Sequence, residues 1–300
     1  MQLDSHRSSS FGDPNYDTPV RAVVLGPEGE PRLADIDEPA GPGDLVRIRA
    51  CGLCGSDVEK IGVSPEGTVL GHEVVAETAD GRRVALVHHG ACGSCAQCLA
   101  GHESLCTFFA APTIRPGGFA ERALAQGVVE LPGSVSDVAG AMIEPLACVL
   151  RGTRHVPPGR VLIVGNGFIG HLFATVLRHR GDEVFAVDLD PRRNGPEPDG
   201  PVDAAILCGR GGVETALDAV RPGGVVLVFA DSGPIPTDRV YRGELTLVGV
   251  RSAAPQLMQE ALVLLPALEL PEAIVLPLER FDEGLALFRR RDALKVVFTP

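Results

Sequence analysis

The sequence predicts an α/β protein with a strand-rich first half and a doubly wound parallel sheet in its second half. Short apolar runs separated by Gly and Pro occupy the chain up to about residue 158. From Gly159 onward, strand-like runs alternate with helical ones. Such alternation is typical of a parallel sheet covered by helices. A chain of 300 residues is also long enough for two domains of average size.

In the first half, strand-forming residues occur in short segments between turn residues, as expected for an all-β body. The cysteine-rich segment 91–107 interrupts them, and the tail from about residue 272 returns to strands around one short helix. Residues 1–18 are polar and are expected to form a disordered leader. The expected strands are 21–25, 45–50, 69–77, 83–88, 119–131 and 295–299, and the tail helix is 282–290.

The second half predicts a sheet that is one strand short. Only the segment 189–201, rich in Pro, Gly and Arg, separates the second strand from the third. Thirteen residues cannot form a helix and a returning parallel strand, so the outermost strand should be missing and about five should remain. The expected strands are 161–164, 183–187, 204–208, 225–229 and 245–250, and the helices are 168–180, 213–220 and 257–268. We expect domains at 19–152 with 270–300, and at 153–269.

Composition narrows the classes of partner. The formal net charge is −12 without a long basic run, which argues against nucleic acid and acidic membranes as partners. No apolar run approaches the ~18 residues that span a bilayer, and the N-terminus does not resemble a signal peptide. A cytoplasmic protein is therefore expected. Clustered cysteines there are more often metal ligands than disulfides.

Four of the eight cysteines form a metal-binding pattern. Cys92, Cys95, Cys98 and Cys106 lie within fifteen residues on a Gly-containing loop. Four thiolates at this spacing can surround a tetrahedral Zn²⁺, and a site of this kind has no open position and holds a loop in place. The bacterial ferredoxin pattern has three residues before its fourth cysteine, whereas seven occur here, so an iron–sulfur cluster is disfavoured.

Three further segments offer scattered metal ligands. They are Cys51-Gly-Leu-Cys54-Gly-Ser-Asp57, Gly71-His72-Glu73 and Glu144-Pro-Leu-Ala147. A catalytic zinc has three protein ligands and one exchangeable position, which one Cys, one His and one Glu would provide. Each residue alone is weak evidence, since a lone His is more often a surface or core residue and a Glu before Pro is often a turn.

A glycine-rich turn follows the first strand of the second half. Gly165-Asn-Gly167-Phe168-Ile169-Gly170 lies between a strand and a helix, the context in which backbone N–H groups bind a dinucleotide diphosphate. Asp188 ends the next strand, where a carboxylate binds the ribose hydroxyls and favours NAD over NADP. Arg192 and Arg193 follow closely and offer the alternative of a 2′-phosphate site, or of a solvated loop.

The order of these motifs, together with Gly117–Glu121, resembles the zinc-containing medium-chain dehydrogenase/reductase superfamily. The sorbitol and threonine dehydrogenase branch is the most similar, and the resemblance runs from about Arg21 to Pro300. It implies a GroES-like catalytic domain, a Rossmann-type cofactor domain, two Zn²⁺ per chain and a homodimer or homotetramer paired through the edge strand 245–250.

The resemblance also implies roles for individual residues. Cys54, His72 and Glu144 would be the catalytic zinc ligands, and Glu73 would be an adjacent acid able to displace the water on the metal. Ser56 resembles the hydroxyl that takes the proton of the alcohol into a relay. Glu59 occupies the position where many relatives have the next group of that relay, a histidine. Cys51 matches a cysteine that is not a ligand.

The predicted function is hydride transfer between a secondary alcohol and NAD, with zinc lowering the pKa of the alcohol. Polyols, cyclitols and sugar derivatives form the expected class of small-molecule substrate. Two alternatives remain: oxidation of an amino alcohol as in L-threonine 3-dehydrogenase, and a non-catalytic scaffold that binds NAD and zinc. The presence of all of Cys54, His72, Glu144 and Ser56 argues against the scaffold.

Overall fold

The computed structural model describes residues 19–253 and 255–300, so the predicted leader 1–18 lies outside the described residues. The described chain forms two compact units. One comprises its residues up to Gly90, Ala110–Met142 and Ala273–Pro300, and the other comprises Ala91–Phe109 and Ile143–Glu272. The cysteine-rich segment and residues 143–152 thus group with the parallel-sheet unit, whereas we placed them in the β-rich domain. The predicted domain boundaries stay a prediction.

The first unit is a β-rich body, as the sequence predicts. Its main sheet has the order β14-β15-β3-β4-β5-β8, and the pair β6-β7 joins it at β3. A separate antiparallel pair is formed by β1 and β2. The strands are β1 Val20–Leu25, β2 Pro31–Ile36, β3 Asp44–Gly52, β4 Glu73–Thr78, β5 Arg83–Leu86, β6 Ile114–Arg115, β7 Arg122–Ala125, β8 Val128–Glu130, β14 Ala273–Pro277 and β15 Lys295–Thr299.

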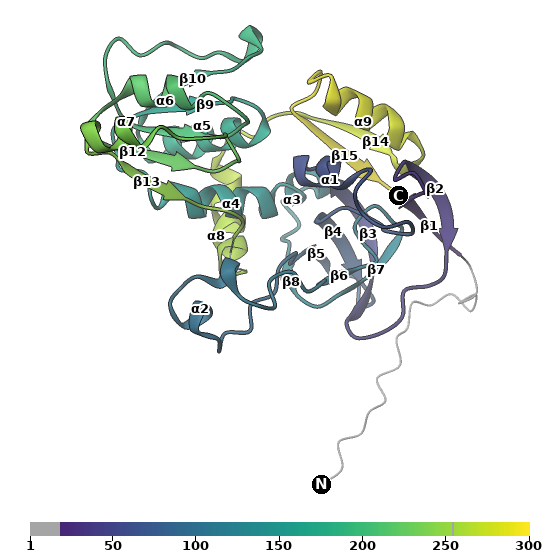
Figure 1. The fold of residues 1–300 in the computed structure, drawn as a ribbon. Coiled ribbons are helices and arrows are strands. Elements are labelled where there is room, and N and C mark those ends of the chain that lie inside the picture. Colours follow the sequence, from purple (N-terminus) through teal and green to yellow (C-terminus); the bar gives the residue numbers. More distant parts are fainter. Residues whose placement is uncertain (1–18, 254) are drawn as a thin grey trace. The chain divides into compact units, whose positions relative to one another are not determined.

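Three short helices and a 3-10 turn complete this unit: α1 Gly55–Lys60, α3 Asp137–Gly140, η4 Leu278–Arg280 and α9 Phe281–Arg289. Helix α9 lies beside β14 and β15 (Figure 1). The core between these elements is centred on the rings of Phe119, Phe281 and Phe298, whose centroids are 4.8–5.7 Å apart. All three rings are buried, so the C-terminal segment completes the core of a body that is built mainly from the first half of the chain.

The second unit contains a parallel sheet of the order β10-β9-β11-β12-β13. In the numbering of the usual order 3-2-1-4-5-6, the strands of this sheet have the order 2-1-4-5-6, so strand 3 is missing. Residues 188–201, where that strand would lie, contain a single 3-10 turn and no strand. The prediction of a missing outermost strand is therefore confirmed. The strands are β9 Arg160–Val164, β10 Glu183–Val187, β11 Val202–Leu207, β12 Val220–Val228 and β13 Thr246–Gly249.

Helices cover this sheet, and α4 packs against both α5 and α8 (Figure 1). Helix α5 agrees with the predicted span 168–180, and Gly181, in a left-handed conformation at φ 98°, ends it. The helices are α2 Ala96–Leu99, η1 Glu103–Leu105, α4 Ile143–Thr153, α5 Phe168–Arg180, η2 Pro191–Arg193, α6 Val213–Ala219, α7 Thr237–Gly243, α8 Gln256–Leu264 and η3 Leu265–Ala267.

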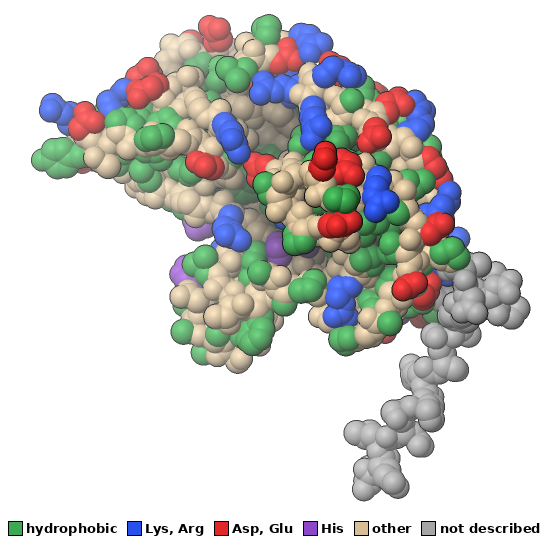
Figure 2. Space-filling model, turned by 45° about the vertical axis from the view of Figure 1, so that its right-hand side comes forward, with side chains coloured by type: hydrophobic (Ala, Val, Ile, Leu, Met, Phe, Trp, Pro, Cys, Tyr) green, Lys and Arg blue, Asp and Glu red, His purple; other side chains and the backbone are tan. Residues whose placement is uncertain are grey.

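No helix of the described residues has the length and apolar character needed to cross a membrane. On the face drawn in Figure 2, basic and acidic side chains are interspersed and no large area carries one sign of charge.

Candidate metal and cofactor sites

Cys54 and His72 are brought together by a buried carboxylate. Cys54 is the N-cap of α1, and His72 directly precedes β4. The Asp57 carboxylate accepts the backbone N–H groups of Cys54 at 3.1 Å and Gly71 at 3.2 Å, and its Oδ1 lies 3.1 Å from Nδ1 of His72. The structure thus joins the segment around Cys54 to the segment around His72, as the predicted site requires.

Asp57 is 1% exposed and carries a charge. Burial by itself raises the pKa of its carboxyl, but the interaction with His72 and the hydrogen bonds from the backbone N–H groups of Cys54 and Gly71 outweigh burial and hold that pKa below its ordinary value. Because Nδ1 of His72 faces Asp57, Nε2 is the ring nitrogen left for a metal, the arrangement found at many zinc sites. Asp57 belongs to the Cys54 motif, but its role was not predicted.

Three donor groups converge in the first unit. Atoms of Cys54, His72 and Glu73 lie within 4.8 Å of one another. This set fits a Zn²⁺ ion, with a thiolate, an imidazole and a carboxylate as donors. Glu144, the third ligand that the resemblance implies, is in the first turn of α4 and belongs to the other unit. Its role as a ligand therefore stays a prediction.

Ser56 and Glu59 both lie on α1, as expected from their spacing. The Ser56 hydroxyl donates to Sγ of Cys54 at 3.4 Å, so it lies next to the candidate metal ligand. Glu59 is exposed. The predicted proton relay through these two side chains stays a prediction.

Lys295 was missed by the sequence analysis. It begins β15, is 1% exposed, and forms a buried ion pair with Glu73, which is also 1% exposed. Its Nζ also donates to the carbonyl oxygen of Leu53 at 3.1 Å. Gly52 leaves room for the pair, because a Cβ there would lie 2.1 Å from Oε2 of Glu73. The available signal was a lysine in an otherwise apolar terminal strand, since a buried lysine needs an anionic partner.

His88 was also missed. Its ring stacks on that of His72, with centroids 4.3 Å apart and an interplanar angle of 27°. Burial is the main cause that lowers the pKa of His88 well below its ordinary value. His88 is thus a neutral imidazole that packs against the candidate ligand ring.

The four-cysteine segment forms a second metal-binding group, as predicted. All four sulfur atoms lie within 4.8 Å of one another. A tetrahedral site with Zn–S distances of ~2.3 Å has S–S distances of ~3.8 Å. Sγ of Cys92 lies 3.9 Å from that of Cys98 and 3.6 Å from that of Cys106, which matches. Hydrogen bonds from Ser94 and from the backbone of Cys95 lower the pKa of Cys92, whereas burial, followed by the hydrogen bond with Cys95, raises that of Cys98.

The glycine-rich turn has the geometry of a phosphate-binding loop. Gly165 adopts φ +93°, and a Cβ at Gly170 would lie 2.2 Å from the carbonyl oxygen of Gly165, so both positions require glycine. Gly167 is the N-cap of α5, and Phe168 and Ile169 are in its first turn. Asp188 directly follows β10, and its Oδ1 accepts the backbone N–H of Asp190 at 2.9 Å. These residues fit the adenosine and diphosphate parts of a dinucleotide.

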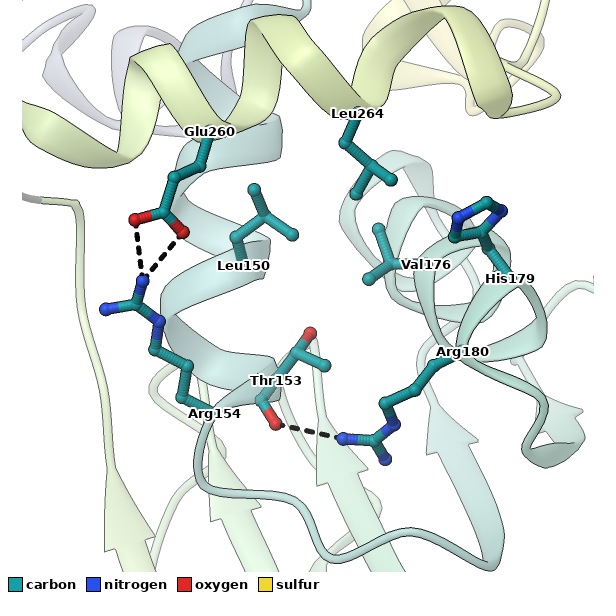
Figure 3. A pocket seen from close by; sticks show the side chains of 8 residues that line it. All are labelled: Leu150, Thr153, Arg154, Val176, His179, Arg180, Glu260 and Leu264. Atoms are coloured by element: carbon teal, nitrogen blue, oxygen red, sulfur yellow. Dashed lines mark hydrogen bonds and ion pairs between the residues drawn. The ribbon is translucent and has the colours of Figure 1, made fainter.

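A pocket of about 480 Å³ in the same unit lies between α4, α5 and α8 (Figure 3). Its three charged side chains are already paired: Arg154 donates to both carboxylate oxygens of Glu260 at 2.8 and 2.7 Å, and Arg180 donates to the carbonyl oxygen of Thr153. It has no part in the candidate site, because none of the predicted ligands or cofactor residues is among its lining residues, which are Leu150, Thr153, Arg154, Val176, His179, Arg180, Glu260 and Leu264.

Comparison with known proteins agrees with this geometry. Residues 41–133 match the alcohol dehydrogenase GroES-like domain. D-altritol 5-dehydrogenase of Agrobacterium fabrum is 27% identical over 82% of this chain and 88% of its own length. L-galactonate-5-dehydrogenase of Escherichia coli is 27% identical over 72% of this chain and 78% of its own.

The fold is also that of solved dehydrogenases. The crystal structure of an alcohol dehydrogenase from Escherichia coli CFT073 with NADH superimposes with a TM-score of 0.80. It is 20% identical and covers 94% of this chain and 99% of that one. The matched domain and these relatives agree with the resemblance of the sequence to the zinc-containing medium-chain dehydrogenase/reductase superfamily. Proteins named sorbitol dehydrogenase and L-threonine 3-dehydrogenase are among the proteins to which the chain is similar.

A substitution in either metal group should remove the zinc ion of that group and leave the other zinc ion bound. We expect two zinc ions per purified chain, one in Cys98→Ser and one in Cys54→Ser, because each variant loses one thiolate of one group. Cys208→Ser is the matched control and should keep two, since Cys208 belongs to neither group. Elemental analysis after desalting measures this, and a Cys98→Ser chain that retains two zinc ions would contradict the assignment.

Replacing only one partner of the Lys295–Glu73 ion pair should destabilise the fold strongly. Lys295→Met leaves the Glu73 charge buried without its cation and should lower the free energy of unfolding by about 3–5 kcal/mol. Adding Glu73→Gln removes that charge and should restore part of the loss. Lys60→Met replaces an exposed lysine and should change the free energy of unfolding by less than about 0.5 kcal/mol. Urea unfolding measures these free energies. Equal losses of stability in Lys295→Met and Lys60→Met would rule out the buried ion pair as the cause.

Proposed function

We propose that the protein is an NAD-dependent zinc dehydrogenase that transfers a hydride between a secondary alcohol and the nicotinamide. Polyols, cyclitols and sugar derivatives are the proposed substrates. The observation that carries the proposal is the convergence of Cys54, His72 and Glu73 beside Ser56 in a chain with a phosphate-binding turn. The similar proteins named above act on a sugar alcohol and a sugar acid, as their names state.

In this proposal Cys54, His72 and Glu144 hold the catalytic zinc, and the four-cysteine group holds the structural one. Zinc supplies a Lewis acid that makes the alcohol more acidic, and NAD supplies the hydride acceptor. Asp57 orients His72 by holding its Nδ1. Ser56 takes the hydroxyl proton of the substrate, and Glu59 passes it to solvent.

Lys295 has a separate part in this arrangement. By binding both Glu73 and the carbonyl oxygen of Leu53, it holds the segment before Cys54 and the segment after His72 in one position. The carboxylate of Glu73 is thereby kept in an ion pair next to the metal donors. The adjacent acid and the ligands are thus preorganised before substrate binds.

Turnover tests the proposal directly. NAD reduction, followed by NADH absorbance, should occur with at least one polyol, cyclitol or sugar derivative, and Cys54→Ser should lower the rate to the blank. Cys208→Ser serves as the matched control and should retain the rate. Turnover of L-threonine alone would establish the amino alcohol alternative instead. If the chain holds two zinc ions and binds NADH but turns over none of these substrates, the non-catalytic scaffold is the remaining alternative.

We also propose a cytoplasmic homodimer or homotetramer. The eight cysteines, all within the described residues, are free thiols, which suits a reducing compartment. In the described sheet β13 has β12 on one side and ends the strand order, so its other edge is available to a second copy. Leu247 on this strand is 38% exposed, and an uncovered apolar edge favours pairing with another chain.

A charge on that strand should weaken the assembly. Leu247→Lys is expected to shift the mass in solution toward the monomer, because a lysine at a paired edge opposes its symmetry mate. Light scattering coupled to size-exclusion chromatography measures the mass. Val63→Lys, at a residue that is 77% exposed in the other unit, should leave the mass unchanged. A monomeric wild-type chain would contradict the proposal.

A further inference from the structure

The pocket between α4, α5 and α8 has no role in the proposed function. Its volume of about 480 Å³ lies in the range of pockets that bind small organic molecules. Leu150 on α4, Val176 on α5 and Leu264 at the end of α8 point into the space between the three helices (Figure 3). Each helix thus contributes one branched aliphatic side chain, and together the three offer an apolar surface to a ligand.

One guanidinium of this pocket is fully used by the fold. Arg180 donates to three backbone carbonyl oxygens at 2.9–3.3 Å, those of Thr153, Val156 and Pro157. Its Nε also lies 2.6 Å from Oδ2 of Asp182, whose side chain is only 2% exposed. Arg180 therefore ties the end of α4 to α5, and its charge is already balanced.

The other ion pair of the pocket is exposed and joins the end of α4 to α8. Nη2 of Arg154 donates to both carboxylate oxygens of Glu260 at 2.8 and 2.7 Å. The two side chains are 58% and 52% exposed. An ion pair in water adds little net stability, because each charge is solvated almost as well when the pair is open. A ligand that offers a partner to both charges can therefore replace this one contact with two.

We propose that this pocket binds an apolar α-amino acid in its zwitterionic form. The carboxylate of the ligand binds the guanidinium of Arg154, and its ammonium group binds the carboxylate of Glu260. Its aliphatic side chain packs on the three apolar side chains of the pocket. A ligand with a single charge would pair with one partner and leave the other without a counter-ion, whereas a zwitterion satisfies both.

This binding site goes beyond the proposed function and does not depend on it. None of the proposed zinc ligands or cofactor-binding residues is among the residues that line the pocket. The amino acid is therefore expected to bind whether or not NADH is present, and without being consumed.

Calorimetry on the zinc-loaded chain tests the proposal with L-leucine as the probe. L-Leucine should bind, and two analogues that each lack one of its charges should bind about tenfold more weakly or worse. These are 4-methylpentanoate, which lacks the ammonium group, and 3-methylbutylamine, which lacks the carboxylate. L-Alanine has both charges but almost no side chain to bury, and it should also bind about tenfold more weakly or worse.

Substitutions locate the site. Arg154→Gln and Glu260→Gln each remove one charge of the pair and should weaken the binding of L-leucine about tenfold. Arg178→Gln is the matched control, since Arg178 lies in the last turn of α5 and does not line the pocket. It should change the affinity less than about twofold. All three side chains are exposed, and circular dichroism checks that the variants fold.

The outcomes separate this inference from the proposed function. No binding of L-leucine up to about 10 mM overturns the inference. Equal affinity for 4-methylpentanoate overturns it in favour of an anion site, and equal affinity for 3-methylbutylamine in favour of a cation site. Equal affinity of L-leucine for Arg154→Gln and Arg178→Gln also overturns it, because the ligand would then bind elsewhere. Each of these results leaves the proposed dehydrogenase intact, and a chain that binds L-leucine but oxidises no alcohol loses the proposed function alone.

Discussion

The candidate catalytic site depends on one buried carboxylate. Asp57 binds the backbone N–H of Cys54, the backbone N–H of Gly71 and the ring of His72. A charge that is 1% exposed would destabilise the fold if it lacked such partners, since an unpaired buried ion is costly. The same contacts that stabilise it hold a thiol and an imidazole next to each other. Local stability and the geometry of the metal site are therefore coupled.

A second buried ion pair extends this coupling to the end of the chain. Lys295 lies on β15, which pairs with β3 at Cys51 and Gly52 and so lies against the segment that leads to Cys54. Strand β15 thus makes two contributions: Phe298 to the aromatic core, and Lys295 as the partner of Glu73. This explains why the β-rich unit is completed by residues that follow the parallel sheet in the sequence.

The features that the sequence predicts correctly are those whose chemistry is encoded in a short stretch of residues. The four cysteines, the glycine-rich turn and helix 168–180 each depend on short spacings, and the structure has them as expected. The strand predicted at 69–77 began too early, because Gly71 and His72 form a turn bound by Asp57 before β4 begins at Glu73. Helix α4 was not predicted, since Pro145 suggested a turn, yet proline is tolerated in the first turn of a helix. Lys295 was not predicted because its partner Glu73 is 222 residues away in the sequence, and His88 because no local motif marks it as a neighbour of His72.

The shortened sheet raises a different question, because removing the outermost strand exposes β10 as an edge. An open edge of unpaired backbone groups invites association with other chains. Here the segment that replaces the lost strand covers that edge, through Gly195 at Ala186 and Asn194 at Asp188. The same segment contains Pro191, Pro196, Pro198 and Pro201, whose missing N–H groups prevent it from becoming a new edge. A segment with four prolines has few conformations to lose, and the hydrogen bond from Nδ2 of Asn166 to the carbonyl oxygen of Arg193 joins it to the glycine-rich turn. The segment that stands in place of the lost strand thus pairs with the edge of β10 and lies against the glycine-rich turn.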